Sequence, residues 1–262
     1  MMSPTIQLNS DQKGLFILPG ETASLYTKRT EPFLEHAEDD VQHKKARNRV
    51  QELFDIDPVW VRVTYSNKDL YPWEGACLWY DEVPSIQLRK SFIESDRIFG
   101  FYHKDEILAH EYVHAVRACF GQAEFEEMLA YATSGPVRGF LGPLFDAPRD
   151  SLLVVAVFTL ITVSALATVT FENAYAIFVW LSCFGTVLLG FLFFRLVRKF
   201  CQFRRCLKRL SHICPKPLSV MIRLTDEEIK LFSELSVDDS RVYVNSLSDY
   251  RWTELKKRFR EL

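Results

Sequence analysis

His110 and His114 stand four residues apart in the run HEYVH, and Glu111 lies between them. Residues four apart on an α-helix are separated by about 40° around its axis, so both imidazoles leave one face and can bind a single metal ion. Glu111 projects from a neighbouring angle, where its carboxylate can take a proton from a metal-bound water without being a ligand. The spacing therefore predicts a metal site with a general base beside it.

The residues around this motif predict a helix over residues 104–120. Apolar residues recur there at helical spacing, and Asp105 and Glu106 occupy the first turn, where the helix dipole favours negative charge. Gly121 is expected to end this helix. A second helix, over residues 122–134, follows directly and begins with a cluster of carboxylates. That helix can supply a third ligand, and a catalytic zinc ion usually has three protein ligands.

With the run EMLA downstream, at residues 127–130, the motif resembles the HExxH and ExxA arrangement of gluzincin metallopeptidases. This resemblance implies a zinc ion held by His110, His114 and Glu127. It also implies that Glu111 activates the water that attacks a peptide bond.

Other carboxylates compete for the third ligand position. Glu126 is the second candidate after Glu127, and Glu124 is the third. Only twelve residues separate His114 from Glu127, so a tight turn must join the two helices.

Two further residues near the motif have more than one interpretation. Arg117, three residues after His114, either binds a carboxylate near the metal or caps the end of the helix. Tyr131 stands where several gluzincins place an acidic residue that orients a ligand histidine. The sequence alone leaves both roles open.

The resemblance covers residues 60–134, and the upstream pattern fits an α+β architecture. Apolar residues at helical spacing predict one backing helix over residues 31–54. Runs rich in branched and aromatic residues predict three strands of a small mixed sheet, at residues 59–65, 75–80 and 85–90. In the resemblance the last strand forms the rim of the cleft, where Ile86 and Leu88 would bind an extended substrate. The alternative is an ordinary strand of the sheet.

Two long apolar segments follow a connector rich in proline and glycine. Residues 152–171 carry no charge, and neither do residues 174–194. At about 1.5 Å per residue each reaches about 30 Å, the hydrocarbon thickness of a bilayer. Glu172 and Asn173 leave room only for a tight turn between them. We therefore expect a hairpin of two transmembrane helices whose outer ends emerge on one side.

Basic residues are concentrated after the second apolar segment, in the run RLVRKFCQFRRCLKRLSH, and the hairpin tip has none. The positive-inside rule then predicts that both termini are cytoplasmic, and the basic run would attract anionic lipid. The six cysteines lack zinc-ribbon spacing and are expected to be free thiols in that reducing compartment. No other run of basic residues interspersed with aromatic residues suggests a nucleic-acid partner.

The sequence after the basic run predicts a small C-terminal element. Thr225 and Glu228 have the spacing of a capping box that opens a helix. Residues 242–244 suggest a short strand, and residues 248–262 a basic amphipathic helix. The element either packs on the catalytic domain, recruits a partner or blocks the cleft. The predicted domains are a metallopeptidase-like part (1–150), a transmembrane hairpin (151–194) and a juxtamembrane and C-terminal part (195–262).

Together, the resemblance and these patterns predict a zinc endopeptidase anchored in the membrane, with its active site facing the cytoplasm and a peptide or protein substrate. An active helix inside the bilayer is excluded, because each of its charges would cost about 2.5–3.5 kcal/mol at the bilayer centre. The alternatives are a catalytically inactive, membrane-tethered adaptor and a zymogen or self-processing enzyme.

Overall fold

The computed structural model describes residues 10–35, 41–71, 74–79, 83–98, 100, 102–121, 124–141, 148–171 and 175–259. The chain divides into two compact units. The first contains residues 1–139 and 202–262, and the second contains residues 140–201. The first unit is therefore assembled from two stretches of sequence that are separated by the second unit.

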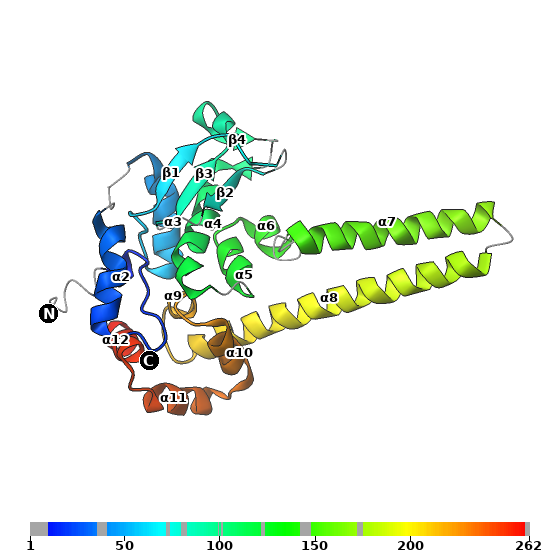
Figure 1. Cartoon of the computed structure of the whole chain (residues 1–262). Helices are drawn as coiled ribbons and strands as arrows, with labels where there is room; N and C mark the ends of the chain where they lie inside the picture. Colours follow the sequence, from blue (N-terminus) through cyan, green and yellow to red (C-terminus); the bar gives the residue numbers. More distant parts are fainter. Residues whose placement is uncertain are drawn as a thin grey trace. The chain divides into compact units, whose positions relative to one another are not determined.

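The first unit is mostly helical with a small sheet, in agreement with the predicted α+β class (Figure 1). The helices in the first part of the chain are α2 (Ala23–Glu35), α3 (Lys44–Phe54), α4 (Lys104–Arg117), α5 (Glu126–Tyr131) and α6 (Pro136–Leu141). The C-terminal helices are α9 (Pro217–Met221), α10 (Asp226–Glu234), α11 (Val237–Ser246) and α12 (Tyr250–Arg258). Short 3-10 turns are η1 (Val41–His43), η2 (Lys90–Ile93) and η3 (Ala118–Phe120).

The three-stranded sheet has the order β1-β3-β2. Its strands are β1 (Arg62–Tyr65), β2 (Ala76–Trp79) and β3 (Ser85–Leu88). Val63 of β1 lies opposite Ile86 in a parallel pair, and Leu78 of β2 lies opposite Ile86 in an antiparallel pair. β3 is therefore the central strand of this mixed sheet. A short antiparallel ribbon, β4 (Arg97–Ile98) and β5 (Tyr102–His103), leads into α4.

Helix α4 is the central element of the first unit, where it packs against α3, α5, β2 and β3 (Figure 1). Nine of its residues are buried, so almost its whole circumference is enclosed. Gly75, just before β2, permits the close approach of the sheet. A Cβ atom there would lie 2.6 Å from Ile107 Cδ1 of α4. The helix that carries HEYVH is thus held rigidly from several sides.

The single backing helix predicted over residues 31–54 is wrong, because two helices share this stretch. α2 ends at Glu35, and the 3-10 turn η1 precedes α3, whose N-cap His43 has φ −105° and ψ 9°. Residues 36–40 lie outside the described part of the chain. Phe33 and Val50 both face the apolar interior from different helices: Phe33 packs edge-on against Trp60, and Val50 is fully buried. Apolar spacing alone does not distinguish this arrangement from one continuous helix.

The C-terminal helices complete the first unit, so the element packs on the rest of the domain. The predicted capping box is confirmed, since Thr225 Oγ1 accepts from the Glu228 amide and Glu228 accepts from the Thr225 amide. The short strand predicted at residues 242–244 is wrong, because these residues lie inside α11.

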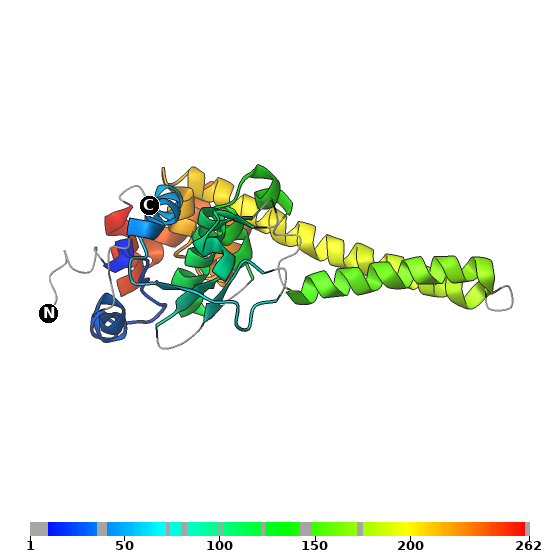
Figure 2. The same cartoon turned by 90° about the horizontal axis from the view of Figure 1, so that it is seen from above.

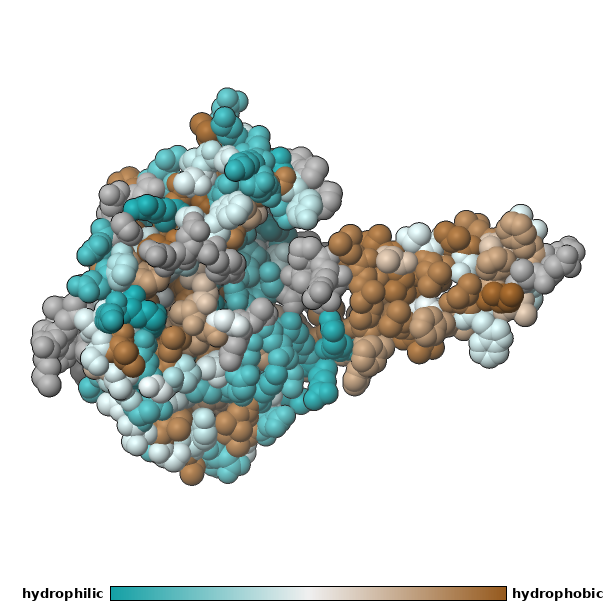
Figure 3. Space-filling view, viewed as in Figure 1, coloured by the Kyte–Doolittle hydropathy of each residue, from teal (hydrophilic) through white to brown (hydrophobic). Residues whose placement is uncertain are grey.

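The second unit consists of α7 (Pro148–Thr170) and the apolar part of α8 (Tyr175–Ser211), which lie side by side (Figures 1 and 2). Both helices are long and apolar enough to span a membrane. Only 11% and 6% of their most apolar windows is buried, unlike the core helices of a soluble protein. Apolar side chains accordingly cover the visible face of this unit (Figure 3). The predicted turn at Glu172 and Asn173 lies outside the described residues.

Close packing holds the two apolar helices together. A Cβ atom at Gly185 of α8 would lie 2.7 Å from Ile161 Cγ1 of α7, so only glycine permits this approach. α8 continues without a break to Ser211, and the basic run is therefore its helical continuation. No disulfide forms among the six cysteines, all of which are described, as the sequence predicts.

Candidate metal centre

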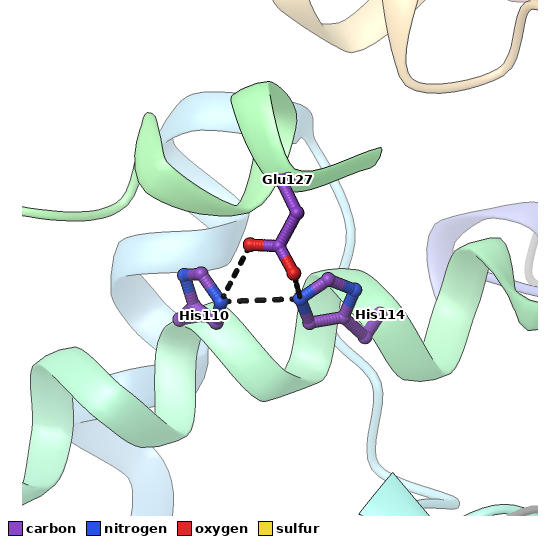
Figure 4. A group of neighbouring side chains, drawn as sticks. All are labelled: His110, His114 and Glu127. Atoms are coloured by element: carbon purple, nitrogen blue, oxygen red, sulfur yellow. Dashed lines mark hydrogen bonds and ion pairs between the residues drawn. The ribbon is translucent and has the colours of Figure 1, made fainter. Parts of the chain in front are cut away.

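Two histidines of α4 and one glutamate of α5 form a compact cluster (Figure 4). His110 Nε2 lies 3.1 Å from His114 Nε2. The carboxylate of Glu127 faces both rings, with Oε2 3.4 Å from His110 Nε2 and Oε1 3.4 Å from His114 Nε2. The structure thus brings together the three side chains that the sequence singles out as ligands.

The separations between these atoms fit a tetrahedral metal ion. Zinc bonds of about 2.0–2.1 Å place neighbouring ligand atoms of a tetrahedron about 3.3 Å apart, and the observed separations are 3.1 and 3.4 Å. Two imidazole nitrogens this close need a proton or a cation between them, because their lone pairs otherwise repel each other. The three residues could therefore hold a metal ion and leave a fourth position for water or substrate.

The charges around the cluster favour a cation. Burial would lower the pKa of His114, but hydrogen bonds with Glu126 and Glu127 raise it well above its usual value. Burial would raise the pKa of Glu127, but hydrogen bonds with His110 and His114 lower it to about 2. Negative charge that stabilises a proton on a ligand nitrogen also stabilises a divalent ion that replaces this proton.

Glu126 contacts the ring nitrogen of His114 that faces away from the cluster. Its Oε1 lies 2.6 Å from His114 Nδ1, and only 10% of its side chain is exposed. An acceptor at this place keeps the proton of neutral His114 on Nδ1, so that the Nε2 lone pair is available to a metal. Glu126, a candidate for the third ligand on the sequence alone, therefore contacts the outer side of a candidate ligand, and Glu127 faces the space between the two histidines.

We expect Glu126→Gln to weaken zinc binding about tenfold, because loss of an outer carboxylate commonly lowers metal affinity 10–100-fold. Competition with a chromophoric chelator measures this affinity. The control is Asp105→Asn, which should bind zinc as the wild type does, because the Asp105 carboxylate pairs with the exposed Lys45 instead. Equal affinities in wild type and Glu126→Gln would contradict the orienting role.

His110 has a different environment from His114. Its Nδ1 is buried and has no hydrogen-bond partner within the described residues. The ring of Tyr131 packs edge-on against the His110 imidazole, with 4.5 Å between centroids and an interplanar angle of 67°. Tyr131, at the position where several gluzincins carry an acidic residue, thus contacts His110 by ring packing.

Glu111 lies beside the cluster and is not part of it. Its negative charge contributes to the raised pKa of His114. Burial, followed by the charge of Glu111, also raises the pKa of Cys77 on β2 to about 11. Glu111 is therefore within electrostatic reach of both the histidine cluster and the edge strand β2.

The substrate-binding role predicted for Ile86 and Leu88 is not compatible with their position. Both side chains are fully buried. Their strand β3 pairs with β1 on one side and β2 on the other, so it has no free edge for an added strand. Sequence pattern identified the strand correctly but could not show its place in the sheet order.

Arg117 does bind a carboxylate, as one of its two interpretations expects, but this is Asp226 of α10, which is not one of the residues of the metal cluster. The side chain is fully buried, and its Nη1 donates to the carbonyl oxygens of Ile222 and Leu224 at 2.9 and 3.0 Å. Its Nη2 lies 3.2 Å from Asp226 Oδ1. No local signal could reveal these partners, which follow more than 100 residues later in the chain.

Comparisons with known proteins found no matching family model, no similar curated protein and no similar solved structure.

Proposed function

We propose that this chain is a zinc-dependent endopeptidase anchored in a membrane. The observation that carries the proposal is the convergence of His110, His114 and Glu127, whose ligand atoms lie 3.1–3.4 Å apart. Two imidazoles and one carboxylate, with a fourth position open, are a ligand set of catalytic zinc sites. The resemblance of HEYVH and EMLA to gluzincin motifs supplies the class of reaction.

Each residue of the site then has a defined task. A bound zinc ion would polarise the scissile carbonyl and lower the pKa of a water molecule toward 7. Glu111 accepts the proton of the attacking water and passes it to the leaving amine. Glu126 keeps His114 in the tautomer that can bind the metal. Glu127 would hold a bound ion through its carboxylate and add negative charge there.

The strand that binds the substrate in this proposal is β2. It is an edge strand of the sheet, and it packs against the active helix α4. Cys77 of β2 is within electrostatic reach of Glu111. An extended peptide can pair with such an edge through main-chain hydrogen bonds, which would place a peptide bond beside the base.

A peptide on β2 should shield Cys77. We expect a saturating peptide hydroxamate, which binds zinc and extends along the strand, to slow alkylation of Cys77. Mass spectrometry of the alkylated chain measures this, and Cys201 in the basic part of α8, outside the sheet, is the internal control. An unchanged rate at Cys77 under saturation would exclude β2 as the substrate strand.

The membrane anchor is the pair α7 and α8. Asp11 and Arg223 form an ion pair within the first unit, although the two apolar helices lie between them in the sequence. If both helices span the bilayer, the chain must therefore return to the side from which it left. The basic continuation of α8 favours the cytoplasmic side for the first unit and for both termini.

Metal removal tests the proposed function on the full chain in detergent. We expect one zinc ion per chain, cleavage of a mixed peptide library, loss of cleavage with phenanthroline and recovery on adding zinc. His114→Ala should lose both zinc and cleavage. A wild-type chain that binds no zinc, even after titration, would refute the proposal.

One observation favours a second candidate, a metal-binding adaptor without catalytic activity. His110 Nδ1 has no hydrogen-bond partner within the described residues, and such a partner normally strengthens a ligand histidine. Bound zinc without cleavage of any library peptide would support this candidate over the peptidase.

A further inference from the structure

The two helices that carry the candidate ligands are joined by a short connection, and one carboxylate from the C-terminal helices binds both of its ends. Arg117 lies three residues after His114 on α4, and Glu124 lies three residues before Glu127 on α5. Asp226 Oδ1 lies 3.2 Å from Arg117 Nη2, and Asp226 Oδ2 accepts the Glu124 amide at 2.8 Å.

These contacts are buried and charged, so they constrain geometry strongly. Arg117 is fully buried, and only 5% of the Asp226 side chain is exposed. The other end of the Arg117 guanidinium binds the carbonyl oxygens of Ile222 and Leu224, just before α10. A buried guanidinium without these partners would be strongly unfavourable, so α4 and α10 cannot shift independently.

A second contact fixes the same end of the connection. Lys230 of α10 forms an ion pair with the side chain of Glu124. Glu124 is thus bound to α10 through both its main chain and its side chain. Phe125, the next residue, is fully buried and anchors the start of α5.

We propose that Asp226 is a positioning residue of the metal site, which sets the separation of α4 and α5 and thereby the reach of Glu127 to the two histidines. This inference rests on the proposed metal site and extends it. The C-terminal helices, which follow the apolar pair in sequence, are then part of what makes the site bind metal.

The variant Asp226→Asn tests the inference on the full chain in detergent. Asparagine offers one acceptor oxygen, so it cannot bind both Arg117 and the Glu124 amide. We expect zinc affinity to fall about tenfold, because α4 and α5 lose the contact that sets their separation and the ligands are no longer held in place. Glu234→Gln, which changes an exposed carboxylate in the last turn of α10, should bind zinc within about twofold of wild type. A purely structural role would lower the melting temperature and leave zinc affinity unchanged, which would overturn the proposal.

Hydrogen exchange on the wild type provides a second test that needs no variant. Coupling between two sites is reciprocal, so zinc binding should slow amide exchange in residues 222–230 as well as in α4 and α5. Protection limited to α4 and α5 would overturn the inference, while zinc binding itself would still support the proposed function. A wild type without zinc binding would refute both.

Discussion

Glu111→Gln should keep one zinc ion per chain and lose peptide hydrolysis by about 10³-fold. General acid–base catalysis by a positioned side chain contributes about 10²–10⁴ in rate, and glutamine cannot accept the proton of the attacking water. The three candidate ligands are untouched by this substitution, so zinc affinity should stay near that of wild type. Zinc content and kcat, measured on the same preparation, separate the two effects.

Asp105→Asn is the matched control for this variant. Asp105 also lies on α4, but its carboxylate pairs with the exposed Lys45, so kcat should remain within about twofold of wild type. Turnover by Glu111→Gln at the wild-type rate would exclude Glu111 as the base. A chain fragment that appears in wild type and is missing from the variant would show that the chain processes itself.

The candidate site was accessible from sequence because its determinants are local. His110 and His114 share a helix face through the period of 3.6 residues, which needs no tertiary information. The next helix begins only a few residues later in the chain, so its carboxylates had to lie close to the two histidines. Helix periodicity alone could not decide whether Glu126 or Glu127 faces the two histidines. Adjacent helical residues point in different directions, and which of them points at α4 depends on how α5 packs against it.

The elements that sequence did not predict correctly depend on distant contacts. Ile86 and Leu88 lie in a strand that pattern identified, but sheet order decides whether a strand has a free edge. Val242 and Val244 have strand propensity, yet they lie in α11, where Ser236 caps the helix and Val244 packs into the core. Tertiary packing overrode the local preference there.

The packing of the C-terminal helices on the rest of the first unit is the main feature of the structure that the sequence does not predict. Buried arginines of these helices bind carboxylates in the N-terminal part of the first unit. No pattern of charges in the sequence indicates these pairs. Arg223 and Arg258 both bind the Asp11 carboxylate, and Arg258 also binds Asp55. The first unit thus needs residues from both sides of the apolar pair to satisfy its buried charges.

Arg223→Met should destabilise the first unit by about 3 kcal/mol, because it removes one partner from a buried network. Arg223 Nε lies 3.0 Å from both oxygens of Asp11, and its Nη1 donates to the carbonyl oxygens of Phe54 and Ser219 at 3.0 and 2.5 Å. Only 2% of its side chain is exposed. Methionine fills much of the space but satisfies none of these acceptors. The melting temperature should fall by about 6–12 °C.

Arg241→Met is the matched control, since Arg241 belongs to the same C-terminal helices but pairs with Asp238 at 3.6 Å on the surface. The side chains of this pair are 57% and 92% exposed, so the loss should be below about 1 kcal/mol. Both variants are compared with wild type by thermal unfolding of the full chain in one detergent. If the C-terminal helices were only loosely attached, the two substitutions would lower the melting temperature equally little. A large drop confined to Arg223→Met would instead show that residues on both sides of the apolar helices fold as one unit.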